Sequence, residues 1–213
     1  MITTNHQPPT TGHQTRARPP MYISAETILG LEKKYGRPEE VSLAYEMTPS
    51  EFEAVRASQK HGRAHDVTLF IIEHGRIVVI RKPMYPPGAY RAPSGGISPG
   101  EPFEAGALRE AYEETGLVVA LDKYLIRSVV AFSHSQDLIN WTSHVFSARR
   151  IKGKLEPIDT HEIVEARFAT VGELMGSIRE ALLASGSTGL RYRSDLNDLV
   201  IGRLIGAGLV TSS

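Results

Sequence analysis

Short runs of β-branched and other apolar residues, separated by glycine and proline, occupy the middle of this 213-residue chain. Two of them, residues 67–73 and 76–82, are joined by His74-Gly75, which is typical of a tight β-hairpin turn. Further strands are predicted over residues 41–46, 124–132, 139–148 and 163–170. We expect a polar loop over residues 133–138, between two of these strands.

Helix signals occur on both sides of the apolar runs. Ser24 is a suitable N-cap, and Thr48-Pro49-Ser50-Glu51 is a capping box with proline at the first helical position. The expected helices cover about residues 24–35, 49–62, 102–115 and 172–184, and a last one begins near Ser194. Strands interleaved with helices predict an α/β fold with a mixed β-sheet.

The chain divides into three parts by composition and pattern. Residues 1–20 are rich in Thr, Pro, Gln and His without apolar periodicity, so we expect a disordered N-terminal tail. Residues 21–62 form an N-terminal extension of helix, strand and helix, and residues 63–213 form the main domain with its C-terminal helices. We expect the extension to cover a sheet edge or to build a homodimer surface. The alternative is that it lines a substrate pocket.

Composition narrows the classes of partner. The formal net charge is +0, so the chain has no general attraction to nucleic acid or to a membrane surface, and nucleic acid is not expected as a partner. The chain has no cysteine, which excludes disulfides, thiolate zinc sites and cysteine nucleophiles. It has no run of roughly 18 apolar residues that could span a membrane. We therefore expect a cytoplasmic protein that recognises a small molecule.

The helix expected over residues 102–115 has an unusual acidic face. Glu110, Glu113 and Glu114 lie within one arc, because residues three and four apart share a helix face. Like charges at this spacing repel, and the last turn of a helix disfavours anions. Arg109 can offset part of this repulsion as the partner of Glu113. A solvated acidic face is the ordinary explanation, but hard oxygen ligands without His or Cys favour Mg²⁺ or Mn²⁺.

The residues around this acidic face make the pattern specific. The segment 95–117 resembles the Nudix box, in which a Gly and a Glu precede Arg-Glu-apolar-x-Glu-Glu-x-Gly-apolar at fixed spacing. All seven fixed positions match: Gly95, Glu101, Arg109, Glu110, Glu113, Glu114 and Gly116. The resemblance implies a Nudix-type α/β/α sandwich over about residues 63–184.

The same resemblance implies roles for these residues. Glu110, Glu113 and Glu114 would be Mg²⁺ or Mn²⁺ ligands, with Glu113, Glu114 and Arg109 forming the catalytic group. Arg109 would orient the carboxylates, and Glu101 would support the loop or a further cation. From the helix alone, Glu114→Gln is expected to lower turnover and to stabilise the metal-free fold slightly, because a like-charge pair disappears.

Similarity to the family also implies an activity. Its members hydrolyse a nucleoside diphosphate linked to another group, X, and ADP-ribose or a similar nucleotide sugar is one candidate substrate. The general base is either a box glutamate or Glu162, which lies on a loop after the box. Two alternatives stay open: a non-catalytic nucleotide sensor that keeps the fold, and an RNA-decapping pyrophosphohydrolase, which would need a basic path for RNA.

Candidate substrate contacts lie outside the box. Tyr90, Phe132 and Trp141 could stack on a nucleobase, although an aromatic residue taken alone is more often part of the core or its rim. Arg91, in the loop that leads into the box, is a further candidate for substrate binding. The basic segment over residues 149–154 is expected to be a solvated hairpin turn rather than an RNA contact.

Overall fold

The computed structural model describes residues 23–59, 62–98 and 100–211. The tail expected over residues 1–20 lies outside these ranges. Within them, no helix combines the length and apolar character needed to cross a membrane.

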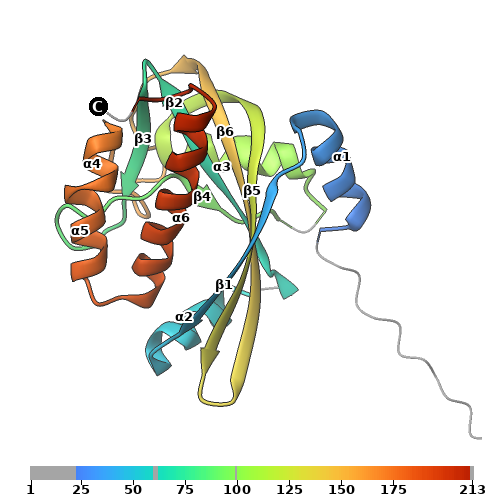
Figure 1. Cartoon of the computed structure of the whole chain (residues 1–213), viewed down its shortest axis with the longest axis vertical. Coiled ribbons are helices and arrows are strands. Elements are labelled where there is room, and N and C mark those ends of the chain that lie inside the picture. The colour runs from blue at the N-terminus through green and yellow to red at the C-terminus, as the bar shows by residue number, and fades with distance from the viewer. Residues whose placement is uncertain (1–22, 60–61, 99, 212–213) are drawn as a thin grey trace, which may run out of the picture.

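A mixed seven-stranded sheet forms the centre of the fold (Figure 1). The strands are β1 (Glu39–Glu46), β2 (His65–Glu73), β3 (Arg76–Arg81), β4 (Ser94–Gly95), β5 (Leu117–His134), β6 (Asp137–Gly153) and β7 (Glu165–Ala169). The helices are α1 (Ala25–Tyr35), α2 (Pro49–Ser58), α3 (Phe103–Thr115), α4 (Val171–Met175), α5 (Ser177–Ala184) and α6 (Thr188–Gly206). The main strand order is β1-β5-β6-β2-β3-β7, and β4 pairs with β2. β1 runs parallel to β5 and β2 runs parallel to β6, so the sheet is mixed as predicted.

The central position of strand β2 explains why its sequence is continuously apolar. Leu69 and Ile71 belong to one buried cluster, together with residues of α1 and α3, whereas Phe70 belongs to a second cluster with α2, α4, α5 and α6. Successive side chains of a strand point to opposite faces, so β2 is buried on both. Figure 1 shows α1 and α3 on one side of the sheet and α4 to α6 on the other. The predicted α/β/α sandwich is therefore confirmed.

The N-terminal extension adds a strand to one edge of the sheet. β1 lies parallel to β5 from the pair Glu39 and Ile126 to the pair Glu46 and Ser133. The capping box at Thr48 forms as predicted, with Thr48 Oγ1 accepting from Glu51 N and the Glu51 carboxylate accepting from Thr48 N. The extension therefore covers the open edge of β5.

Strands β5 and β6 are longer than their sequences predicted. The loop expected over residues 133–138 is mostly strand, because Ser133 already pairs with Leu138. What remains is a tight turn at Ser135, whose φ of 54° is left-handed. The expected hairpin turn over residues 149–154 is also wrong, since most of this segment is the end of β6. Arg150 there pairs with Val119 in the sheet and with Glu73 by an ion pair of 3.2 Å. Charged side chains suit this end because they face solvent.

Four helix boundaries differ from expectation. α2 ends at Ser58, with Gln59 as its C-cap, rather than near residue 62. Pro102 is the N-cap of α3 rather than its first residue. The helix expected over residues 172–184 is divided into α4 and α5 at Gly176, whose φ of −109° and ψ of −107° interrupt the helical backbone. α6 begins at Thr188, well before Ser194, because Ser187 caps it by accepting from Leu190 N.

Candidate functional site

The acidic helix α3 lies between strand β4, which pairs with the amino-terminal part of β2, and a glycine that ends the helix. Gly116, with a left-handed φ of 71°, ends the helix, while β4 pairs Ser94 with Thr68 of β2 in front of it. Ala107 and Ala111 of α3 are fully buried against the sheet. The small side chain of Ala111 allows this close packing. Of the three box glutamates on the helix, Glu113 is the most exposed and Glu114 is buried.

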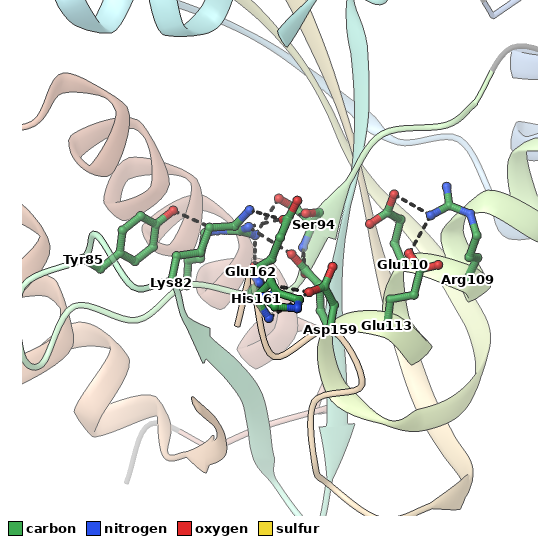
Figure 2. Close-up of polar contacts among 12 residues, drawn as sticks. Lys82, Tyr85, Ser94, Arg109, Glu110, Glu113, Asp159, His161 and Glu162 are labelled. Atoms are coloured by element: carbon green, nitrogen blue, oxygen red, sulfur yellow. Dashed lines mark hydrogen bonds and ion pairs between the residues drawn. The ribbon is translucent and has the colours of Figure 1, made fainter. Parts of the chain in front are cut away.

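Arg109 links four parts of the box. Its Nη1 donates to Glu110 Oε1 at 2.9 Å and to Glu113 Oε2 at 2.7 Å. Its Nε donates to Glu101 Oε1 at 2.9 Å, and its Nη2 donates to the carbonyl oxygen of Gly96 at 3.0 Å. Figure 2 shows Arg109 bonded to Glu110 and Glu113. The expected Arg109–Glu113 pair is thus present, within a larger network.

Glu101 holds the loop that precedes α3. It accepts from Ser98 N at 2.9 Å and from Arg109, and the hydrogen bond from Arg109 lowers the pKa of Glu101. Gly106 lies directly under this carboxylate, because a Cβ at Gly106 would stand 2.8 Å from both Glu101 Oε2 and Ile97 Cδ1. A glycine inside the helix therefore allows the loop to pack against it.

Glu114 is buried and ion-paired with Arg91. Arg91 Nη2 donates to Glu114 Oε1 at 3.2 Å, and Ser94 N donates to Glu114 Oε2 at 2.7 Å. Arg91 also donates to Tyr85 Oη, to Ser94 Oγ and to the carbonyl of Ala92. Burial raises the pKa of Glu114, although Arg91 opposes the shift. Arg91, predicted as a substrate contact, thus also holds a box glutamate.

Glu110 and Glu113 have different surroundings. Glu110 lies against Gly95, where a Cβ would stand 1.9 Å from Glu110 Oε2, so only glycine leaves room for this carboxylate. Burial raises the pKa of Glu110 to about 7, with Arg109 partly opposing the shift. The Glu113 side chain is 43% exposed. Burial therefore outweighs the nearby arginine at Glu110 as it does at Glu114, but the arginine beside Glu110 is partly exposed whereas the one beside Glu114 is buried.

The donor set suits a hard divalent cation. The three box carboxylates, Glu110, Glu113 and Glu114, are oxygen ligands of the kind that Mg²⁺ and Mn²⁺ prefer. Within the described ranges, no group of three or more His, Asp or Glu side chains is arranged to hold a metal. In this structure Arg91 and Ser94 N engage Glu114, and Arg109 engages Glu110 and Glu113.

A cleft of about 400 Å³ lies beside the box. Its lining residues are Ser58, Arg63, Asp66, Lys82, Met84, Tyr85, Arg91, Ser94, Gly95, Gly96, Glu110, Trp141, Glu162 and Arg193. Glu162, the predicted auxiliary residue, therefore shares a cleft with Glu110. Lys82 Nζ donates to Glu162 Oε2 at 2.7 Å, and Asp159 Oδ1 accepts from the backbone N–H groups of His161 and Glu162 (Figure 2).

A second pocket, of about 230 Å³, shares residues with this cleft. Both cavities are lined by Ser58, Asp66, Tyr85, Trp141 and Arg193, and the second is completed by Met47, Val55, Phe132, Gly189 and Tyr192. The N-terminal extension therefore contributes Met47, Val55 and Ser58 to the walls. Two elements far apart in the chain, α2 and α6, meet at this pocket.

The aromatic substrate candidates separate into two groups. Trp141 lines both cavities and Phe132 lines the smaller one. Tyr90 lines neither; its hydroxyl donates to Glu165 Oε2 at 2.7 Å, and Arg167 lies 4.4 Å from the centre of its ring. The pairing of Tyr90 with β7 could not be anticipated from its position in the loop.

Several cleft residues were missed from the sequence: Ser58, Arg63, Asp66, Lys82, Tyr85 and Arg193. Most look like ordinary loop or surface residues when taken one at a time. Asp66 did offer a signal, because a carboxylate stands at the beginning of an apolar strand that is buried on both faces. Arg193 offered none, since its place on α6 is set by tertiary packing.

The chain matches the model of one protein family. A NUDIX domain family model matches residues 60–186, close to the extent that the box predicted. No curated protein matches the chain.

Several solved structures are similar to this chain at low identity. A MutT NUDIX hydrolase from Burkholderia pseudomallei is 23% identical, with a TM-score of 0.41 over 51% of this chain and 83% of that one. A UDP-X diphosphatase is 21% identical, with a TM-score of 0.40 over 69% and 72%. An ADP-ribose pyrophosphatase from Streptococcus suis is 16% identical, with a TM-score of 0.38 over 58% and 92%. The family match, rather than these likenesses, is decisive.

Proposed function

Since this chain belongs to the NUDIX domain family, we propose that it is a Mg²⁺- or Mn²⁺-dependent hydrolase of a nucleoside diphosphate linked to another group, X. The reaction breaks the pyrophosphate bond and yields a nucleotide and phosphorylated X. ADP-ribose and similar nucleotide sugars are candidate substrates. The observation that best supports this proposal is the Arg109 network, which holds Glu101, Glu110 and Glu113 beside a cleft that also contains Arg63, Lys82 and Arg193.

Glu110, Glu113 and Glu114 are the residues that would hold the cation. When bound, a divalent cation neutralises phosphate charge and lowers the pKa of a coordinated water. Arg109 orients Glu110 and Glu113 by charge-assisted hydrogen bonds, and Arg91 does the same for Glu114. Fixed carboxylates need less reorganisation as the reaction proceeds, which lowers the barrier.

Arg63 is the cleft cation best placed for the substrate. Its Nε donates to the carbonyl of Ser58 at 3.1 Å, and among the described residues it has no carboxylate partner. Its guanidinium lies against Gly96, where a Cβ would stand 1.8 Å from Arg63 Nη1. A guanidinium beside the box loop suits a phosphate oxygen, because it can donate two parallel hydrogen bonds.

Glu162 and the box glutamates are the candidates for moving the proton of the attacking water. Glu162 lines the cleft, and Lys82 holds its carboxylate there at 2.7 Å. Its side chain is 60% exposed, so a proton taken from the cleft can pass on to solvent.

An activity assay across substrate classes tests the proposal. Purified protein is incubated with Mg²⁺ or Mn²⁺ and, in turn, ADP-ribose, nucleotide sugars, dinucleoside polyphosphates, oxidised nucleoside triphosphates and capped RNA, and products are separated by chromatography. We expect a nucleotide and phosphorylated X from at least one diphosphate, abolished by EDTA and by Glu110→Gln but not by the exposed control Glu156→Gln. Uniform inactivity would favour a nucleotide sensor.

A further inference from the structure

We infer that Asp66 is the hydrogen-bond acceptor that recognises the nucleobase. The preferred substrates then carry a base with an amino group at its edge, and guanine is the most preferred base. The inference rests on the proposed function, because it concerns the nucleoside end of the same diphosphate. It names a residue outside the Nudix box and a class of base.

Asp66 is a buried carboxylate, and only one of its two oxygens has a hydrogen-bond partner among the described residues. The residue is 5% exposed and lies at the beginning of β2. Its Oδ2 accepts from Arg193 Nη2 at 3.1 Å, whereas its Oδ1 has no hydrogen-bond partner among the described residues. Buried polar atoms in native proteins are nearly always paired, and an unpaired one destabilises the fold. A ligand donor is the partner that the position favours, since Asp66 lines both cavities.

The direction of the carboxylate is fixed by Arg193. Besides bonding to Asp66, Arg193 donates from Nη1 to Thr68 Oγ1 at 3.2 Å, and its guanidinium lies 5.1 Å from the ring centre of Tyr192. The guanidinium therefore has a defined place between β2 and α6, and it holds one carboxylate oxygen. The other oxygen, Oδ1, is buried without a partner among the described residues, and a donor that reaches it from the cavity would satisfy it.

The walls of the smaller pocket suit a flat apolar body. Phe132, Trp141 and Tyr192 line it together with Met47 and Val55. A nucleobase is the planar aromatic part of a nucleoside diphosphate derivative, and stacking on aromatic side chains favours its binding. The two cavities share five residues, so a base in the smaller pocket leaves its diphosphate in the cleft beside Glu110.

The charge of Asp66 selects among bases. An ionised carboxylate only accepts hydrogen bonds, so it favours an edge that donates. Guanine presents an imino N–H next to an amino group, and adenine and cytosine present an amino group. The single imino N–H of uracil or thymine lies between two carbonyl oxygens, which a carboxylate repels. Hypoxanthine matches guanine except for the missing amino group, so it isolates the proposed contact.

The experiment compares guanosine, inosine and uridine diphosphate sugars that differ only in the base. For the wild type we expect kcat/KM to fall about tenfold or more from guanosine to inosine, and further to uridine. In Asp66→Asn the amide oxygen stays with Arg193 and the NH₂ group faces the base, so the guanosine preference should disappear or reverse. Asp198→Asn is the matched control, since Asp198 also accepts from an arginine, Arg179 Nε at 2.9 Å, but lies outside both cavities.

The outcomes separate this inference from the proposed function. Hydrolysis with equal kcat/KM for all three bases would overturn the role of Asp66 and leave the function standing. So would an Asp66→Asn enzyme that slows equally on every base. If the wild type hydrolyses none of these diphosphates, calorimetric binding of GMP and IMP decides: tighter GMP binding that Asp66→Asn abolishes supports the inference, and equal binding overturns it. Melting temperatures establish that each variant is folded.

Discussion

Arg91 Nη2 lies 3.2 Å from Glu114 Oε1, and the two side chains are only 4% and 5% exposed. The box glutamate is therefore compensated by a buried guanidinium from the preceding loop, in addition to any cation it binds. This pair reverses the earlier argument about stability. Helix neighbours alone suggested that neutralising Glu114 would relieve repulsion, but the change also leaves Arg91 charged and buried without its partner.

We expect Glu114→Gln to destabilise the metal-free protein. Removing one partner of a buried ion pair costs roughly 3–5 kcal/mol. Burial already disfavours the charge of Glu114 and raises its pKa, and the amide oxygen can still accept from Ser94 N, so the cost should lie near the lower end. For a chain of this size that corresponds to a fall of about 6–12 °C in Tm. Turnover on the true substrate should also fall by at least about a hundredfold.

Glu113→Gln is the matched control, because Glu113 pairs with Arg109 at an exposed position. Exposed pairs of this kind contribute only about 0.3–0.5 kcal/mol, so Tm should change little. Equal melting temperatures for the two variants in EDTA would contradict the structural role given to Arg91.

Glu110 should make the metal-free protein less stable as pH rises. Its pKa of about 7 in the fold lies above the 4.5 of an unperturbed glutamate. Below pH 4.5 the carboxyl is protonated in both states; above pH 7 it is charged in both, and the fold bears the cost of burial. In EDTA, Glu110→Gln should thus match the wild type near pH 4.5 and exceed its unfolding free energy by up to ~3 kcal/mol near pH 8.

Denaturant titrations at several pH values measure this difference. A constant offset between the two proteins would show that Glu110 does not change its protonation. Adding Mg²⁺ at pH 8 should stabilise the wild type more than Glu110→Gln, because a ligand raises stability only through the site it binds.

Trp141 should affect the Michaelis constant more than turnover at saturation. It lines both cavities, and loss of a stacking surface costs roughly 1–3 kcal/mol, so Trp141→Leu should raise KM about five- to 150-fold. Trp141→Phe keeps an aromatic face and should raise KM less. Tyr90→Phe should leave KM unchanged, because Tyr90 lies outside both cavities. A large fall in Tm with an unchanged KM would make Trp141 a purely structural residue.

His144 should stay neutral in acid and weaken the fold there. Its imidazole is fully buried between Tyr124 Oη at 2.5 Å and His65 Nδ1 at 3.0 Å, and burial lowers its pKa to about 3. Below pH 6.5 the unfolded chain binds a proton that the fold does not, so stability falls by up to ~1.4 kcal/mol per pH unit. NMR of the imidazole nitrogens should find His144 uncharged at pH 4.5, and titration near pH 6.5 would refute this assignment.

Much of the fold follows from local sequence signals. Ser24 and Thr48 cap the first two helices where expected, and His74-Gly75 makes the turn of the β2–β3 hairpin with φ values of 51° and 72°. These features depend on a few neighbouring residues. The lengths of β5 and β6 do not, because residues 149–153 extend as a strand only through pairing with residues 117–120.

The contacts of the candidate site also divide into those between neighbouring residues, which the sequence predicts, and those between distant residues, which it does not. Arg109 finds Glu113 within its own helix, so spacing alone predicted their pair. Arg91 and Glu114 are 23 residues apart, and Asp66 and Arg193 are 127 apart. Such contacts depend on how the loop, β2 and α6 pack, and a single sequence has no local signal for that packing.

The parallel pairing of β1 with β5 has a consequence for the order of folding. Glu39 must wait for Ile126, 87 residues later in the chain, before its strand has a partner, and contacts of such long separation form slowly. During synthesis, β1 and the following helix α2 therefore cannot pack onto the sheet until β5 has left the ribosome. The wall that Met47, Val55 and Ser58 supply to the cavities should therefore form late in folding.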